Sequence, residues 1–215
     1  MARVDTRLAL MRAAEQLFAQ QGVDRVSLRE IAIAAGQRNV SAATYHFGSK
    51  RELIEAILER HSRKIQDDWI LLLEGDKGKA LSLRQLIQLL VRPIVGKVDD
   101  ADGGRCYLEL CAELVASRSF PLMGMRVATT SGAATLGRRI AEHGPALPGM
   151  FAVIRGTRLA GLLYGSIGDY LRLTANGIEI SRSLFVSDLV SVLVAAVHAD
   201  APSEQEPEWP FSAAR

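Results

Sequence analysis

Aromatic residues are scarce in this 215-residue sequence, at 6%, whereas alanine, leucine, isoleucine and valine are plentiful. This balance favours helices over strands. Hydrophobic residues make up 48% and charged residues 23% of the chain, which is ordinary globular composition with enough length to bury a core. We therefore expect one or two helical domains.

Cysteine is almost absent, and long apolar runs are missing. Cys106 and Cys111 lie five positions apart and do not share a helical face, so a disulfide between them is not expected and both should be reduced thiols. The most apolar run, Leu184–Val197, is interrupted by polar residues and is too short to span a bilayer. The N-terminus, MARVDTRLAL, lacks the apolar core of a secretory signal. We expect a cytoplasmic protein with no membrane partner.

Signatures of catalysis and of metal binding are also lacking. The four histidines, His46, His61, His143 and His198, are far apart and show no metal-ligand spacing. There is no glycine-rich phosphate loop and no convergent nucleophile, base and acid. The sequence predicts no enzyme, no metal and no cofactor. Two alternatives stay open: a helical enzyme, and an adaptor that binds only protein.

Charge is unevenly distributed along the chain. Residues 1–64 hold 11 Lys/Arg and 7 Asp/Glu, a net charge of +4, and the remainder holds 15 and 17, a net charge of −2. A basic N-terminal third indicates an anionic partner at one end of the molecule, although such an excess is common by chance.

The first 64 residues contain the clearest helix signals. Apolar residues recur at helical spacing from Leu8 to Phe18, and Gly22 should end that helix. Ser27 and Glu30 form a capping box that begins a second helix, which Gly36 should end. A short third helix is expected at about Val40–Phe47. Ser49 and Glu52 form a second capping box that begins a long fourth helix.

The rest of the chain is also predicted to be helical, at residues 82–97, 104–118, 123–143, 150–174 and 180–199. Residues 75–78 and 99–104 should be loops, and Pro93 should kink or shorten its helix. The tail at 200–215 is rich in proline and glutamate and is expected to be disordered. The sequence thus predicts an all-α fold of about nine helices.

Two short helices joined by a turn, with a longer helix on each side, predict a helix-turn-helix. Several spaced elements of residues 1–64 resemble the DNA-binding domain of the tetracycline-repressor (TetR) family of transcriptional regulators: Ala13-Ala14, Leu17-Phe18, Gly22, Val26–Ala32, Ala35-Gly36, Tyr45–Phe47 and Ser49–Leu53. The resemblance implies a helix-turn-helix domain at 1–64 and a helical effector-binding and dimerisation domain at 65–199.

The resemblance also implies a role for each matched position. Tyr45, Lys50, Ser27 and Thr44 match phosphate contacts, and Ser41, Ala42 and Ala43 match the part of the recognition helix that faces base edges. The physical chemistry of Lys50 agrees, because a cation at a helix N-terminus costs a few tenths of a kcal/mol unless an anion lies opposite. Phe47 is expected to turn inward. Core packing of these aromatics, with Lys50 merely exposed, is the alternative.

The sequence departs from the pattern of the family that it resembles in the turn before the recognition helix. The spacing from Gly36 to Tyr45 is two residues longer than in most relatives, with Gln37, Arg38 and Asn39 filling the turn. These residues either make additional DNA contacts or form a longer exposed turn, and His46 either contacts a phosphate or bonds the helix end. The predicted DNA-binding set is Ser27, Arg38, Asn39, Ser41, Ala42, Ala43, Thr44, Tyr45, His46 and Lys50.

The last two predicted helices carry small residues at helical spacing, flanked by leucine and valine. Such a pattern suits close helix packing, either within one chain or across a two-fold dimer interface, which the resemblance favours. The predicted interface is Gly161, Gly165, Leu184, Ser187, Ser191, Val194 and Ala195. Large apolar groups on the middle helices either pack the core or enclose an effector. The predicted pocket is Trp69, Leu90, Tyr107, Leu110, Met123, Phe151, Arg155 and Tyr164.

Together these features predict a homodimeric, DNA-binding transcriptional regulator. We expect a ligand-responsive repressor that binds a palindromic operator in double-stranded DNA and responds to a small-molecule effector.

Overall fold

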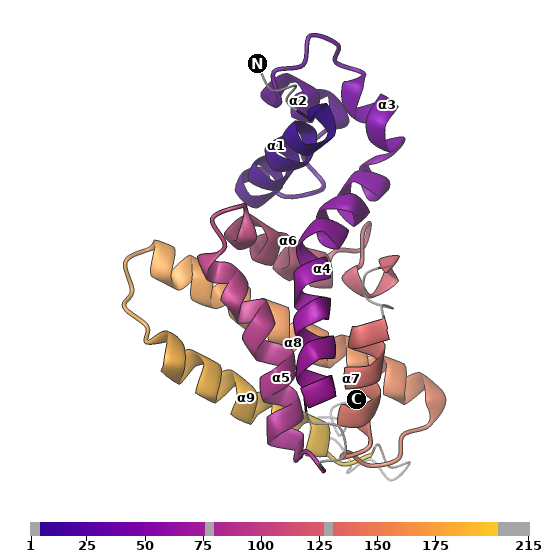
Figure 1. Ribbon diagram of the computed structural model, residues 1–215, viewed down its shortest axis with the longest axis vertical. Helices are drawn as coiled ribbons and strands as arrows, with labels where there is room; N and C mark the ends of the chain where they lie inside the picture. The colour runs from indigo at the N-terminus through magenta and orange to yellow at the C-terminus, as the bar shows by residue number, and fades with distance from the viewer. Residues whose placement is uncertain (1–4, 76–79, 127–130, 202–215) are drawn as a thin grey trace, which may run out of the picture.

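The computed structural model describes residues 5–75, 80–126 and 131–201. Within these ranges it contains nine α-helices, two 3₁₀ turns and no strand, which confirms the predicted all-α fold. Four helices form the N-terminal part: α1 (Thr6–Gln21), α2 (Leu28–Ala34), α3 (Ala42–Phe47) and α4 (Lys50–Gly75). Figure 1 shows α1–α3 gathered at one end, with α4 leading from them into the other helices.

Local chemistry sets the ends of these helices as predicted. The side chain of Asp5 accepts from the backbone N–H of Arg7 and caps α1, and Gly22 ends that helix with a φ of 85°. Ser27 and Glu30 form both bonds of a capping box at the start of α2. At α4, the hydroxyl of Ser49 accepts from the backbone N–H of Glu52 at 3.2 Å.

Five helices complete the fold: α5 (Leu83–Gly96), α6 (Gly104–Ala116), α7 (Ser131–Ala141), α8 (Gly149–Ala175) and α9 (Arg182–His198). They agree with the predicted segments to within one or two residues, except at 123–143. Pro93 lies inside the last turn of α5, where it has no N–H to donate to the carbonyl of Leu89, so the helix lacks that backbone bond shortly before its end at Gly96. The predicted disordered tail at 200–215 falls almost entirely outside the described residues.

The prediction of a helix at 123–143 was wrong for its first residues. Residues Leu122–Gly124 form a 3₁₀ turn, η2, and Met125 is extended; residues 127–130 lie outside the described residues, and α7 covers Ser131–Ala141. Pro121 precedes the turn, and Leu122 and Met125 are both buried. Their i, i+3 spacing suits a single anchored turn as well as a helix, so periodicity could not separate the two.

The core lies where α4, α5, α6, α8 and α9 meet. Helix α6 packs on α8, and α5 packs on α9 (Figure 1). The α6–α8 crossing depends on Gly168, because a Cβ there would lie 2.7 Å from the Cβ of Ala112. Gly168 therefore serves packing within the chain. In the described part of the chain, no helix is both long and apolar enough to cross a membrane.

Candidate DNA interface and ligand cavity

Helix α3 presents a polar outer face at one end of the molecule. Ser41, Thr44, Tyr45 and His46 are exposed, and Tyr45 is 85% exposed with its ring edge-to-face on His46. Phe47 turns inward, as predicted, and is 6% exposed beneath the guanidinium of Arg7. The tyrosine hydroxyl has no hydrogen-bond partner among the described residues and is free to bind from solvent.

Ala42 and Ala43 do not belong to this outer face. They are 8% and 0% exposed, and α3 packs on α1, α2 and α4. Their side chains therefore point into the fold, and the DNA contact that was predicted for this part of α3 would have to come from its backbone or its exposed neighbours. Their role is packing, because two small side chains let α3 sit close to its neighbours. A helix of six residues has fewer than two turns, so the sequence pattern could not fix which side faces outward.

The turn between α2 and α3 is built from its own polar side chains. The Oδ1 atom of Asn39 accepts from the backbone N–H of Ser41 at 2.9 Å, and the amide of Gln37 donates to the carbonyl of Ala35. This is an Asx turn, so the connection between α2 and α3 is held by its own side chains. Arg38 is exposed. Arg38 and Ser41 are therefore placed to reach a surface that meets α3.

Ser27 is committed to the capping box. Its hydroxyl donates to Oε2 of Glu30 at 2.7 Å, and the pKa of Glu30 is lowered chiefly by that bond. A phosphate contact from the Ser27 side chain would have to share this hydroxyl with Glu30, although the residue itself is exposed.

Lys50 is held by the loop between α1 and α2. Its Nζ donates to the carbonyl oxygen of Val23 at 2.9 Å, lies 3.4 Å from that of Asp24, and stands 5.7 Å from the ring centre of Phe120. The ammonium at the N-terminus of α4 therefore has partners in its own chain, in addition to any phosphate. An ammonium has three donors, so one remains for an external anion.

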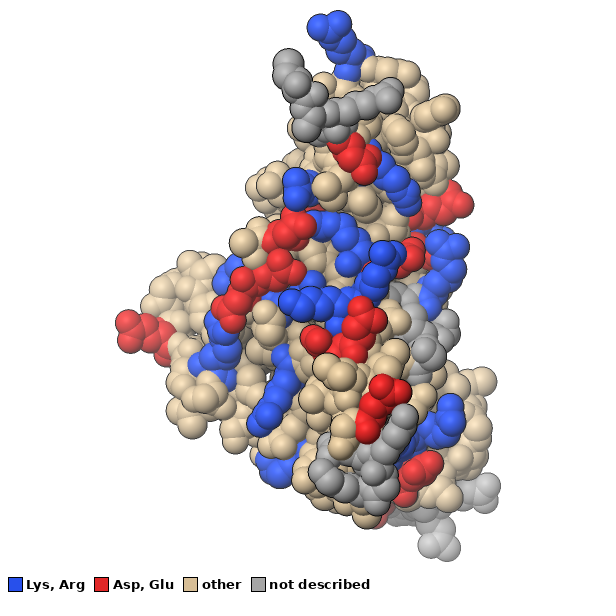
Figure 2. All heavy atoms as spheres, in the orientation of Figure 1, with Lys and Arg blue, Asp and Glu red and all other residues tan. Residues whose placement is uncertain are grey.

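A buried ionic cluster joins α1 to the rest of the molecule. Glu15 of α1 is 2% exposed, and its Oε1 lies 2.7 Å from Nη1 of Arg60 and 3.0 Å from Nε2 of His61, both on α4. Arg60 also pairs with Asp102, which in turn pairs with Arg12 of α1. Figure 2 shows basic and acidic side chains interleaved where α1 meets α4 and α6.

The buried cluster around Glu15 also contacts α6, through His61. The ring of His61 stacks on Tyr107 of α6, with ring centres 4.8 Å apart. In addition, Oε1 of Glu113 on α6 accepts from the backbone N–H of Val23 at 2.6 Å. Burial raises the pKa of Glu113, an effect that the Val23 N–H partly opposes. Sequence reasoning missed these joints, because their partners lie 45 to 90 positions apart.

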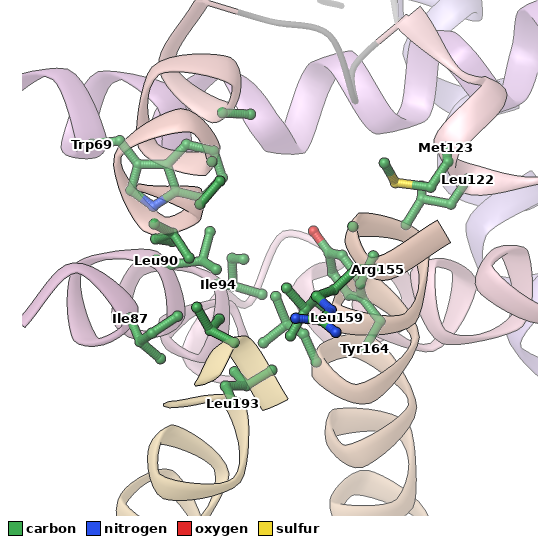
Figure 3. Close-up of a pocket in the computed structure, with 18 of the residues that line it drawn as sticks. Trp69, Ile87, Leu90, Ile94, Leu122, Met123, Arg155, Leu159, Tyr164 and Leu193 are labelled. Atoms are coloured by element: carbon green, nitrogen blue, oxygen red, sulfur yellow. The ribbon is translucent and has the colours of Figure 1, made fainter. Parts of the chain in front are cut away.

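A cavity of about 610 Å³ lies beneath α4. It is lined by side chains from α4 through α9, and six of the eight predicted pocket residues line it: Trp69, Leu90, Tyr107, Met123, Arg155 and Tyr164. The other two do not. Leu110 is buried elsewhere in the core, and Phe151 is 45% exposed outside the cavity. Figure 3 shows Trp69 and Leu90 on one side, Met123 on the other, and Arg155 and Tyr164 between them.

Few polar groups face this cavity. Burial, with smaller effects from its neighbours Cys111 and Tyr164, raises the pKa of Tyr107 far above its usual value, and burial likewise raises the pKa of Cys111 to about 12. The Tyr107 hydroxyl and the Cys111 thiol are therefore neutral at physiological pH. Arg155 donates to the carbonyls of Ala199 and Asp200, at 2.6 and 2.7 Å.

The outer surfaces of α8 and α9 carry the residues predicted for dimerisation. Leu184 is 71% exposed, Ser187, Ser191 and Ala195 are also exposed, and Val194 is partly exposed. A Cβ added to Gly161 or Gly165 would meet nothing within 4 Å, so these glycines are not needed for packing within the chain. Further exposed apolar residues on these helices lie outside the predicted interface: Met150, Phe151, Val153, Leu162 and Val192.

Helices α2 and α3, held between α1 and α4, form a helix-turn-helix DNA-binding domain attached to a helical body that encloses a cavity. Residues 10–57 match the family model described as bacterial regulatory proteins, tetR family. The N-terminal part of this chain is therefore a DNA-binding domain of the TetR type. None of the curated proteins compared with the chain matches it.

Solved structures support the same fold. A structure from Shewanella sp. PV-4, described as a tetR family transcription regulator, is 16% identical with a TM-score of 0.63, and the match covers 91% of this chain and 99% of that one. A TetR-family structure from Rhodococcus sp. is 20% identical with a TM-score of 0.53, covering 90% and 97%. A TetR-like regulator from Rhodococcus sp. RHA1 is 17% identical with a TM-score of 0.52, covering 92% and 96%.

Proposed function

We propose that the protein is a homodimeric, ligand-responsive transcriptional repressor, with a DNA-binding domain at residues 1–64 and an effector-binding and dimerisation domain at 65–199. One observation carries the proposal. Helix α4 begins at Lys50 beside the exposed face of α3, and further along it supplies Ser62, Gln66 and Trp69 to the cavity lining. A single rigid element thus connects the candidate DNA surface to the candidate effector site.

DNA recognition would use the outer face of α3. Tyr45, Thr44 and the third donor of Lys50 contact backbone phosphates, and Ser41, Arg38 and His46 are placed to reach the duplex beside them. Since a single short helix makes few contacts, two copies would enter successive major grooves about 34 Å apart on a palindromic operator. Phosphate contacts give such binding a steep dependence on salt. Because its target is genomic DNA, the protein would act in the cytoplasm.

Effector response would be a shift between two shapes of the dimer. A ligand in the cavity weakens DNA binding only if it binds more tightly to the shape whose recognition helices no longer match the grooves. The contacts between α1, α4 and the loop before α6 would carry that change to the helix-turn-helix, because Arg60 of α4 pairs with Glu15 of α1 and with Asp102 of that loop.

The experiment is an electrophoretic mobility shift with DNA flanking the protein's own gene, at low and at moderate salt. The proposal expects a shift that weakens as salt rises. If no DNA fragment shifts at low salt, the protein-binding adaptor is the better account.

A further inference from the structure

The cavity combines an apolar wall with one hydrogen-bond donor that has no acceptor. Trp69 is 7% exposed and lines the cavity, and its indole Nε1 is the buried side-chain nitrogen or oxygen left without a partner among the described residues. An indole N–H can only donate a hydrogen bond, so it stays unsatisfied unless an acceptor atom lies within reach. Buried polar groups in native structures almost always have partners, so this one requires an explanation.

The charges around the cavity restrict the ligand further. Among the described residues, its lining includes no aspartate, glutamate, lysine or histidine. Arg155 is the one charged residue of this described lining, and the backbone carbonyls of Ala199 and Asp200 already accept from its guanidinium. A cationic ligand would find no carboxylate here and would meet a like charge. An anion could bind only the three guanidinium N–H groups that these carbonyls leave free.

We propose that this cavity binds an uncharged, mostly apolar small molecule bearing one carbonyl-type oxygen, and that this oxygen accepts a hydrogen bond from Nε1 of Trp69. This inference rests on the proposed role of the cavity as the effector site. The volume of about 610 Å³ lies in the range of small-molecule sites. Ketones, esters and lactones with an aliphatic body belong to this class.

Binding would also rearrange the wall of the cavity. The Nε1 atom has less than 1 Å² of accessible surface, and Figure 3 shows Leu90 of α5 beside the indole. A ligand oxygen reaches the nitrogen only when a neighbouring side chain turns aside. The contact between α4 and α5 changes at that moment, so the hydrogen bond is linked to the position of the helix that begins at Lys50.

The test compares probes of matched size on purified full-length protein without DNA. The probes are 2-decanone, decanoate, decyltrimethylammonium and hexylbenzene, which lacks an acceptor. Trp209→Phe makes Trp69 the sole tryptophan of the chain, so that quenching of its fluorescence reports binding. The expected order places 2-decanone tightest, with the cation weakest. Tighter binding of the cation or of decanoate, or no binding of any probe, overturns the proposal.

Trp69→Phe isolates the hydrogen bond. Binding of each probe to this variant is followed by calorimetry, because the fluorophore is lost. The affinity for 2-decanone should be weaker by about 2- to 13-fold, the worth of one neutral hydrogen bond, and the affinity for hexylbenzene should be unchanged. Equal loss for both probes would mean that the indole only packs, and would refute the role of Nε1. Phe151→Leu, on α8 but outside the cavity, is the control and should bind both probes as the unchanged protein does.

A second readout avoids any folding defect of that variant. In the Trp209→Phe protein, the ¹⁵N-labelled indole N–H signal of Trp69 should move downfield when 2-decanone binds and should not do so with hexylbenzene. An unchanged signal with bound ketone contradicts the proposal. Because no DNA is present, this outcome is separate from the proposed function: the protein can fail to bind DNA while the order of probes holds.

Discussion

Replacing Glu15 with alanine tests the ionic joint between the helix-turn-helix and the rest of the fold. The carboxylate is 2% exposed and lies 2.7 Å from Arg60 and 3.0 Å from His61. Removing one partner of a buried pair costs about 3–5 kcal/mol, because the other charge remains desolvated. Asp102 still pairs with Arg60 in the variant, so the lower end, about 3 kcal/mol, is expected.

The measurement is thermal unfolding at a fixed protein concentration. For a chain of this size, about 3 kcal/mol corresponds to a fall in Tm of about 6–12 °C. Arg12→Ala is the matched control, because Arg12 pairs with Asp102 at the surface, where its side chain is 55% exposed. That exposed pair is worth about 0–1 kcal/mol.

The contrast between the two variants decides the argument. If Glu15→Ala melts within about 2 °C of Arg12→Ala, which corresponds to less than about 1 kcal/mol, then Arg60 is not held as a desolvated charge. The joint described between α1 and α4 would then contribute little to the fold. The double variant Glu15→Ala with Arg60→Ala should recover part of the loss, because it removes the unpaired charge together with its partner.

Three further predictions concern the DNA surface, the second joint and the dimer. Tyr45→Phe should leave Tm unchanged but weaken DNA binding of the dimer by about 150-fold or more, measured by fluorescence anisotropy, since two copies each lose a hydrogen bond to a charged phosphate. Unchanged affinity would remove this hydroxyl from the interface. Burial raises the pKa of Glu113, so the stability that its protonated carboxyl contributes is complete near pH 4 and is lost as pH rises through the raised pKa. Glu113→Gln still accepts from Val23 but cannot ionise, so the fall in unfolding free energy from about pH 4 to 7 should be flatter in this variant. An equal slope in both proteins would contradict this. Leu184→Asp should raise the dimer Kd more than about 100-fold in analytical ultracentrifugation. Leu71 on α4 is about as exposed as Leu184, and Leu71→Asp should leave the dimer Kd unchanged. Equal effects of the two substitutions would place the interface elsewhere.

Local signals in the sequence were sufficient for the helices and their ends. Capping boxes, stop glycines and apolar periodicity depend on residues within four positions of each other, so Ser27, Ser49 and Gly22 could be assigned directly. The break at Met125 was missed because one buried 3₁₀ turn has the same apolar spacing as a helix.

The candidate sites were predictable only in part, for a related reason. The pocket residues of α4 and α5 were found because large apolar side chains on consecutive helices must face the same core. The orientation of Ala42 and Ala43, and the carbonyl partners of Lys50, depend on how distant segments pack. Pairs such as Val23 with Glu113 leave no local pattern in a sequence.

Selection of bound DNA from a random pool by the purified protein tests the central claim most directly. The account predicts enrichment of an inverted repeat whose half-sites lie about 10 base pairs apart, centre to centre, or a multiple of that spacing. Recovery of no enriched sequence, or of a single unrepeated site bound equally well by Tyr45→Phe, would contradict it.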